Sequence, residues 1–433
     1  MSTLFTNVTA LLMDDDFSTL KDGFVAVEGS KIAYVGATRP EGTFDEVIDC
    51  TGKVMMPGFV NTHTHIPMTL MRGYGGGQNL QDWLHNYIFP AESRLDDRSV
   101  AAGTGLGLAE MISSGVTCIA DMYSRTGVIA EEIVKAGISA NLSCGGVYFG
   151  TPGDFSENTC NDCRNQIALT EQWHKFGGDQ IIVDASLHAE YTSCAPLWQW
   201  MADFARNHGQ RMHVHVSETR SEHAASLSRH GLSPIQVLDK YGAWDNGGIA
   251  AHCVYTTEED WAIMSAKDIT AVHNPYSNLK LGSGMAPVPA MLNAGVNVSL
   301  GTDGMSSHNS CDMFQDMKLA ALLPCGIQGD PTAMTARRVL EMATVGGAKA
   351  LGRNTGRIAA GCTADLILVD FEAPNLFPCH DIAENLVYSA NASNVVMNMA
   401  RGKVIYRNGE FLTLDLDRIK AEIRSHALPL IFG

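Results

Sequence analysis

The chain has 433 residues, of which 45% are hydrophobic, and a formal net charge of −17 at pH 7. It is too long for one minimal domain and has the length of a large α/β barrel with an appended domain. Proteins that bind nucleic acids or anionic membranes usually carry a basic face, so this charge argues against both partners. We expect a small-molecule substrate instead.

The N-terminal segment shows no export signal. It lacks a basic stretch followed by an apolar core, and no apolar run approaches the roughly 20 residues of a membrane span. Eleven dispersed cysteines are typical of reduced thiols rather than of a disulfide framework. The sequence therefore predicts a cytoplasmic protein. Cys160 and Cys163 form a CxxC without the second pair of a zinc ribbon, and we interpret them as two thiols in a loop.

Strand-like runs and turns alternate at both ends of the chain. Residues 1–56 predict a small antiparallel sheet, and the same alternation of strand-like runs and turns occurs again over residues 357–433. We expect the two ends to combine into one small β-sandwich domain. A terminal helix is expected to begin near Asp415 or Asp417, either of which can cap it.

Residues 57–356 have a different pattern, in which short apolar runs alternate with longer segments of helical period. The apolar runs are VMMPGFVNTHTH, GVTCIADM, SANLSCGG, DQIIVDASLH, QRMHVHVSE, GGIAAHCV, ITAVHNP and NVSLGTDG. Eight such runs predict an α/β fold of the (β/α)8 TIM-barrel type. In this fold the active site lies at the C-terminal ends of the strands, so polar residues at those ends converge.

Two of these runs end in a pair of histidines. His63 and His65 are two positions apart on a strand, which points both imidazoles to the same side. A His-x-His pair alone is weak evidence, but its place at a strand end strengthens it. His213 and His215 repeat the pattern, and we select His215 as the ligand because it lies nearer the strand's end. His213 then has a structural role deeper in the barrel.

Other strand ends carry further polar side chains. Glu218 is either a solvated loop carboxylate or a group that carries protons beside a metal-bound hydroxide. His252 ends an apolar run, where the alternative is a buried histidine bonded to the backbone. A buried Asp303 is costly unless it is paired or metal-bound, and it can both ligate a metal and accept a proton from water. His188 and His273 are expected to face the C-terminal opening of the predicted barrel. We interpret His188 as a substrate contact and assign no role to His273.

Three imidazoles and a carboxylate form a donor set typical of catalytic zinc, which keeps one position for water and lowers its pKa to about 7. The fourth predicted strand offers no lysine that could bridge two metals. We therefore expect one Zn²⁺ per subunit in a hydrolase.

Several longer blocks occur in a fixed order: PGFVNTHTHIPMTLMRGY, DWLHNYIFPAE, HVHVSET, AHCVY, HNPYSNLKLGSG and GTDGMSSHN. In these blocks the chain resembles the amidohydrolase superfamily, specifically its methylthioadenosine/S-adenosylhomocysteine deaminase group, over nearly its full length. The resemblance implies that His63, His65, His215 and Asp303 bind zinc. It also implies that His252 orients the water on the metal.

The resemblance assigns the remaining roles to substrate contacts. It implies that Glu218 shuttles a proton to the purine ring, with Asp303 also near the substrate, and that Glu92 holds the ribose hydroxyls. His188 would contact the substrate as well. Trp83 either packs against the nucleoside or is a core aromatic on a helix face.

The sequence departs from the family pattern in three places. Glycines occupy positions 75–77, where acidic residues are common, and His308 stands where asparagine is usual. The third strand ends in residues 144–146, CGG, without the arginine that meets the homocysteine carboxylate in some relatives. Either Arg125 or Arg164 substitutes from a loop, or the preferred substrate is neutral.

The expected activity is hydrolytic deamination of an adenine nucleoside to the inosyl product and ammonia. Methylthioadenosine, S-adenosylhomocysteine and adenosine are the candidate substrates, and assembly into a homo-oligomer is expected on family grounds. One alternative is hydrolysis of another heterocycle, such as a guanine, pterin or triazine. The other is a non-catalytic scaffold on the same fold.

Overall fold

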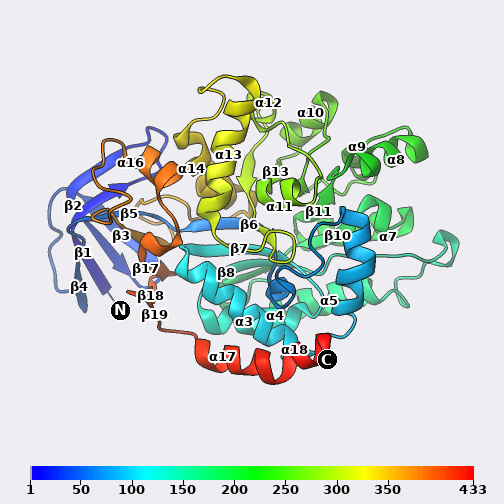
Figure 1. The fold of residues 1–433 in the computed structure, drawn as a ribbon, viewed down its shortest axis with the longest axis horizontal. Coiled ribbons are helices and arrows are strands. Elements are labelled where there is room, and N and C mark those ends of the chain that lie inside the picture. The colour runs from blue at the N-terminus through cyan, green and yellow to red at the C-terminus, as the bar shows by residue number, and fades with distance from the viewer. Residues whose placement is uncertain (1) are drawn as a thin grey trace.

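The computed structural model describes residues 2–433, which form a barrel flanked by a sheet built from both ends of the chain (Figure 1). The sheet has nine strands in the order β19-β18-β17-β16-β5-β1-β2-β3, with β4 also paired to β1. Its strands are β1 (Ser2–Leu11), β2 (Thr19–Glu28), β3 (Lys31–Gly36), β4 (Glu46–Asp49), β5 (Lys53–Pro57), β16 (Leu366–Asp370), β17 (Val395–Ala400), β18 (Lys403–Arg407) and β19 (Glu410–Phe411).

The two ends of the chain meet where β5 pairs antiparallel with β16. Met55 lies opposite Leu368, and both side chains are buried in a core that the sheet encloses by itself. The prediction of a purely antiparallel sheet is wrong, because β4 and β5 run parallel to β1. The hairpin partner β2 occupies one edge of β1, so β4 and β5 pair with the other edge. They reach it after a longer connection, which allows them to run parallel to β1.

The barrel strands form two parallel five-stranded sheets, in the orders β10-β11-β12-β13-β14 and β15-β6-β7-β8-β9. They are β6 (Phe59–His65), β7 (Val116–Met122), β8 (Ser139–Ser143), β9 (Ile181–Val183), β10 (Ala185–Ala189), β11 (Met212–Val216), β12 (Gly248–His252), β13 (Ile269–His273), β14 (Val298–Leu300) and β15 (Asp303–Gly304). All eight predicted runs are strands, and the barrel fold class is confirmed.

Three of the eight runs are broken, and two of the breaks are where the two sheets meet. At Asp184 the amide donates to Leu142 on β8, and the next amide donates toward β11, at Arg211. At Gly301 the amide still donates to His273 on β13, after which β15 pairs with β6. The first run is also divided, at Gly58, between β5 and β6. A Cβ there would lie 2.2 Å from the Thr117 side chain.

Helices cover the outside of the barrel between successive strands (Figure 1). The longer ones are α3 (Asp97–Ser113), α4 (Thr126–Ala136), α5 (Asn161–Trp173), α7 (Ala195–His208), α8 (Arg220–His230), α9 (Pro234–Lys240), α10 (Glu258–Ala266), α13 (Met313–Gln328) and α14 (Ala336–Ala343). Shorter ones are α11 (Pro275–Lys280), α12 (Val288–Asn293) and α15 (Val345–Ala350).

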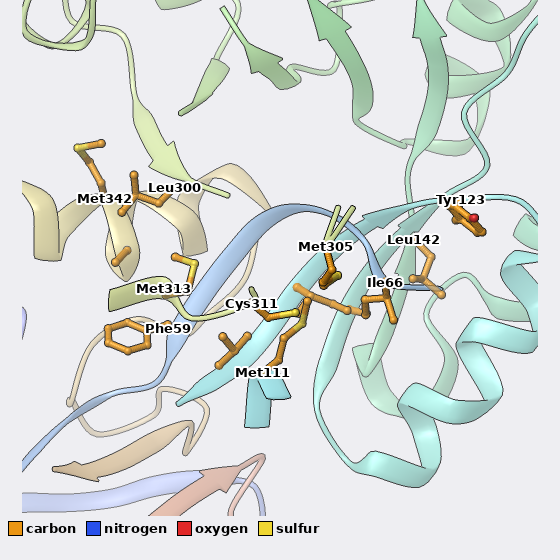
Figure 2. Packing of buried hydrophobic residues seen from close by; sticks show 14 of the residues in the cluster. Phe59, Ile66, Met111, Tyr123, Leu142, Leu300, Met305, Cys311, Met313 and Met342 are labelled. Carbon is orange, nitrogen blue, oxygen red and sulfur yellow. The ribbon is translucent and has the colours of Figure 1, made fainter. Parts of the chain in front are cut away.

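The main core lies between these helices and the strands. Figure 2 shows part of it, in which Phe59 lies among other buried residues such as Met111 and Met313. The ring of Phe59 on β6 meets the ring of Phe314 on α13 edge to face, with centroids 5.0 Å apart. Packing of this kind fixes the N-terminal end of β6, and two of the predicted ligands lie toward the other end of the same strand.

The chain ends in a helical segment beside α3, where α17 (Leu416–Glu422) begins after Asp415 and α18 (Leu428–Phe432) follows (Figure 1). The Asp415 carboxylate accepts from the amide of Arg418, as the predicted cap requires. Arg94 donates to the carbonyl of Ile431 at 2.7 Å. The last helix is thereby fastened near α2 (Phe89–Glu92), which carries Glu92.

The CxxC pair does not lie in a loop as expected. Cys160 is the N-cap of α5, and Cys163 lies in the first turn of this helix. All eleven cysteines are free thiols. Among the helices of residues 2–433, none is both long and apolar enough to cross a membrane.

Candidate active site

The predicted site residues gather at one cavity of about 270 Å³ at the C-terminal ends of the barrel strands. Helices α1 (Leu80–Trp83) and α2 form part of its wall. The predicted residues that line it are His65, Trp83, Glu92, His188, His215, Glu218, His252 and Asp303. A larger and more open groove of about 790 Å³ lies against the nine-stranded sheet and contains none of them.

The four predicted ligands lie close together, and all of them except His63 line this cavity. The Nε2 atoms of His63 and His65 lie 3.4 and 3.3 Å from Oδ1 of Asp303. Nε2 of His65 lies 3.3 Å from Nε2 of His215. Two groups of residues have ligand atoms close enough together to hold a metal ion, and both include His63: one adds His65 and Asp303, the other His215 and His252.

Two of these imidazoles direct their Nε2 atoms at each other. Nδ1 of His65 donates to the carbonyl of Met122, and Nδ1 of His215 donates to the carbonyl of His188 at 2.7 Å. Since a carbonyl only accepts, Nε2 of each neutral ring carries a lone pair, and a positive charge between them relieves the repulsion. Burial lowers the pKa of His65, but Asp303 raises it to about 9 overall. A metal cation supplies the same positive charge.

His63 is the most enclosed member of the group. It is fully buried, and among residues 2–433 its Nε2 finds no hydrogen-bond partner. Burial lowers the pKa of His63 to about 3 and that of His215 well below its usual value, so both rings are neutral at pH 7. Neutral imidazoles together with a carboxylate oxygen form a donor set that fits a zinc ion.

Asp303 uses its two oxygens differently. The hydroxyls of Ser277 and Ser307 donate to Oδ2 at 2.6 and 3.0 Å, while Oδ1 faces the two imidazoles of β6. Burial opposes ionisation, but His63 and His65 hold the pKa of this carboxyl well below its usual value. Asp303 therefore keeps one ionised oxygen directed at the predicted metal position.

Glu218 and His252 lie together beside this group. Nε2 of His252 is 3.8 Å from Oε2 of Glu218, and Nδ1 of His252 is 2.8 Å from Oδ1 of Asn278. Ser283 donates to Oε1 of Glu218 at 3.1 Å. Burial raises the pKa of Glu218, which suits a carboxyl that gives and recovers a proton.

Two of the site residues have left-handed backbones. The φ angle is 74° at His252 and 62° at Asp303, a region that costs non-glycine residues about 1–3 kcal/mol. This conformation turns the chain sharply at the point where β12 ends and β15 begins. Such strain is typical of functional sites, because the surrounding fold must hold it in place.

The same cavity is lined by the predicted substrate contacts. Burial raises the pKa of Glu92, while the nearby Tyr123 hydroxyl lowers it. His188 also lines the cavity. Trp83 is buried in α1 and donates from Nε1 to the carbonyl of Tyr74 at 3.2 Å. It is thus a core aromatic of its helix and also part of the cavity wall.

Sequence reasoning missed the segment that surrounds these groups. Within seven residues, Ser277 bonds Asp303, Asn278 bonds His252 and Ser283 bonds Glu218. The available signal was a dense run of polar residues after a predicted strand, in HNPYSNLKLGSG. Which side chain each one contacts depends on the folded barrel and could not be obtained from spacing.

Glu222 was also missed. Its two carboxylate oxygens accept from the amides of Ser217 and Glu218, both at 2.8 Å, so it fixes the backbone that carries Glu218. Burial and then the neighbouring Glu218 raise the pKa of Glu222 to about 7. The signal in the sequence was a capping box, with Thr219 as the N-cap of α8 and Glu222 three residues later.

Two other histidines lie outside the cavity lining. His273 was expected to face the mouth, but it is only 3% exposed and does not line the cavity, because the chain turns into α11 directly after Asn274. His308 donates from Nε2 to Asp316 at 2.7 Å, and both are fully buried. His308 therefore has a structural partner of its own.

Neither arginine proposed as a substitute reaches the cavity. Arg125 pairs with Asp97, and Arg164 donates to the carbonyl of Asn158 at 2.7 Å. Of residues 2–433, no lysine or arginine lines the cavity.

Comparison with known proteins agrees with this site. Residues 54–405 match the family model described as "Amidohydrolase family". The chain belongs to the amidohydrolase family. This amidohydrolase is 40% identical over 425 residues to the 5'-deoxyadenosine deaminase of Methanosarcina mazei, covering 98% of this chain and 97% of that one. It is also 40% identical over 406 residues to the 5-methylthioadenosine/S-adenosylhomocysteine deaminase of Moorella thermoacetica, covering 93% and 94%.

A solved structure has the same fold as this amidohydrolase. The adenosine deaminase from Xanthomonas campestris, which has bound zinc, superimposes with a TM-score of 0.93 at 31% identity, covering 99% of this chain and 98% of that one. The group to which the sequence was assigned by resemblance is thereby confirmed.

Zinc should stabilise the folded protein through this site. At a free zinc concentration of one hundred times Kd, binding to the folded state alone raises the free energy of unfolding by about 2.7 kcal/mol. His215→Ala should abolish this gain in urea titrations with and without zinc. The matched control is His380→Ala, an exposed histidine that should keep the gain. Full stabilisation of the His215→Ala variant would contradict the predicted ligand set.

Proposed function

We propose that this amidohydrolase is a zinc-dependent hydrolytic deaminase of adenine nucleosides. It replaces the 6-amino group of the purine by oxygen and releases ammonia and the inosyl product. The observation that carries the proposal is a single cavity in which the converging imidazoles, a buried Glu218 and a separate Glu92 face the same space. The names of the relatives, all deaminases of adenine nucleosides, support it.

The metal would be held by His63, His65, His215 and Asp303. When bound, zinc supplies the Lewis acidity that makes water a nucleophile at neutral pH. The ligands' positions at the ends of β6, β11 and β15 leave the cavity side of the cluster open to substrate.

The chain's own residues then move the protons. Water, oriented by His252, forms its bond to C6 of the purine, and Asp303 takes the proton that the water loses. Glu218, kept protonated more readily by burial, donates to the adjacent ring nitrogen. The C6–N bond breaks and the amino group leaves as ammonia with the proton that Asp303 took from water. The second proton of that water leaves the C6 oxygen and returns to Glu218, which restores the acid and gives the inosyl product. Ser283 and Glu222 hold Glu218 in position for this step.

Glu92 and His188 would bind the sugar. The carboxylate of the half-buried Glu92 can accept from two neighbouring hydroxyls at once, which is the arrangement of the ribose 2′ and 3′ positions. Trp83 supplies an apolar surface nearby. One zinc ion per subunit, homo-oligomeric assembly and a cytoplasmic location stay predictions from the sequence.

Adenosine, 5′-deoxyadenosine, methylthioadenosine and S-adenosylhomocysteine should be tested for loss of adenine absorbance. At least one should be turned over. Glu218→Gln should retain zinc by elemental analysis but lose about 10²-fold or more in kcat, the usual contribution of a general acid–base group. Glu259→Gln, an exposed change on α10, is the control and should act as the wild type.

Two outcomes would contradict the proposal. If none of the four nucleosides reacts while guanine, a pterin or a triazine does, the substrate class is wrong. If Glu218→Gln works normally, the proton-transfer role is wrong. Absence of both metal and turnover in the purified protein would support the scaffold alternative.

The cavity favours an uncharged 5′ substituent. Four carboxyl groups line it, those of Glu92, Glu218, Glu222 and Asp303, and no lysine or arginine of residues 2–433 does. The homocysteine carboxylate would have to be desolvated or left at the mouth without a cationic partner, which costs binding energy.

We therefore expect kcat/KM for methylthioadenosine or 5′-deoxyadenosine to exceed that for S-adenosylhomocysteine by about tenfold or more, equivalent to about 1.4 kcal/mol. Steady-state kinetics with the three substrates at one pH provide the measurement. Equal values for all three would show that a charged tail is accommodated outside the cavity, and the preference would be refuted.

A further inference from the structure

We propose that His213 is a positioning residue that sets the tautomer of His63 and so directs the Nε2 lone pair of His63 toward the metal. The inference rests on the proposed role of His63 as a zinc ligand. His213 itself does not line the cavity and has no contact with substrate in the mechanism above.

The three predicted histidine ligands are oriented in two different ways. Nδ1 of His65 donates to the carbonyl of Met122, and Nδ1 of His215 to the carbonyl of His188. A backbone carbonyl can only accept, so these two rings have one possible tautomer when neutral. The acceptors are main-chain atoms, and side-chain substitution does not remove them.

His63 lacks such a carbonyl. Its Nδ1 lies 2.9 Å from Nε2 of His213, and either nitrogen of this pair can be the donor. The tautomer of His63 therefore depends on the tautomer of its neighbour. Both rings are buried, with 0% and 1% of their surfaces exposed, so water does not compete for this bond.

Ser143 favours one direction for the hydrogen bond between His63 and His213. Its hydroxyl donates to the carbonyl of Asp121 at 3.2 Å, and its oxygen lies 3.1 Å from Nδ1 of His213. With the one hydroxyl proton directed at the carbonyl, the oxygen of Ser143 is free to accept from Nδ1–H of His213. Nε2 of His213 then accepts from Nδ1–H of His63. In this chain of hydrogen bonds from His63 through His213 to Ser143, Nε2 of His63 keeps its lone pair.

That lone pair belongs to the atom on which the site depends most. His63 is shared by both groups of residues that can hold a metal, and its Nε2 has no hydrogen-bond partner among residues 2–433. Without an acceptor at His213, the proton of His63 can move to Nε2, where Asp303 Oδ1 at 3.4 Å accepts it. A protonated Nε2 cannot bind zinc, and it also occupies the carboxylate oxygen.

The test compares a leucine and a glutamine at position 213. His213→Leu removes the acceptor, whereas the amide oxygen of His213→Gln can take the place of Nε2 as an acceptor for His63. Zinc affinity is measured by competition with a chromophoric chelator. We expect the leucine variant to lose about 10- to 100-fold, the usual effect of removing a partner of a metal ligand, and the glutamine variant to stay within a few-fold of the wild type.

Ser143→Ala provides a second variant in case the leucine variant does not fold. It leaves His213 in place but frees its tautomer, so zinc affinity should fall by less than it does in His213→Leu but measurably. Urea unfolding of the metal-free proteins separates a general loss of stability from a loss of zinc binding.

Unchanged affinity in both His213→Leu and Ser143→Ala would overturn the proposal. So would equal losses in the leucine and glutamine variants in parallel with metal-free stability, since that pattern indicates packing alone. These readouts need no substrate, so a wild type that binds zinc but deaminates nothing would refute the proposed function and leave the role of His213 testable.

Discussion

The structure of the site is governed by a cluster of buried groups that repel one another unless a positive charge lies between them. The Nε2 atoms of His65 and His215 face each other at 3.3 Å, and Asp303 directs an ionised oxygen at the same point. No neutral arrangement of these side chains relieves this crowding as well as a metal cation does. The barrel tolerates the cluster because rigid strand ends hold each group in place.

The rest of the site serves to keep the cluster and its protons in order. One polar segment, Ser277 to Ser283, donates to Asp303 and Glu218 and bonds His252, while Glu222 holds the backbone of Glu218. The C-terminal helix is fastened near α2, which brings Glu92 to the cavity. Metal ligands, proton-transfer groups and sugar contacts therefore come from different elements, and each group has its own support.

Much of this could be predicted from the sequence, because period and position determine it. The alternation in THTH and MHVHV places two imidazoles on one face, and the barrel brings strand ends together. What could not be predicted depends on tertiary contacts between distant segments. The break at Asp184, the parallel return of β5 to β1 and the bond between His63 and His213, 150 positions apart, leave no periodic signal. The roles assigned to the site residues remain predictions.

The central claim is that one metal ion is held by His63, His65, His215 and Asp303. Crystals of the zinc-loaded protein, measured at the zinc absorption edge, test it most directly. The account predicts a single anomalous peak about 2.0–2.2 Å from Nε2 of each histidine and from Oδ1 of Asp303. A peak at another position, or a second peak of equal height in the cavity, would contradict it.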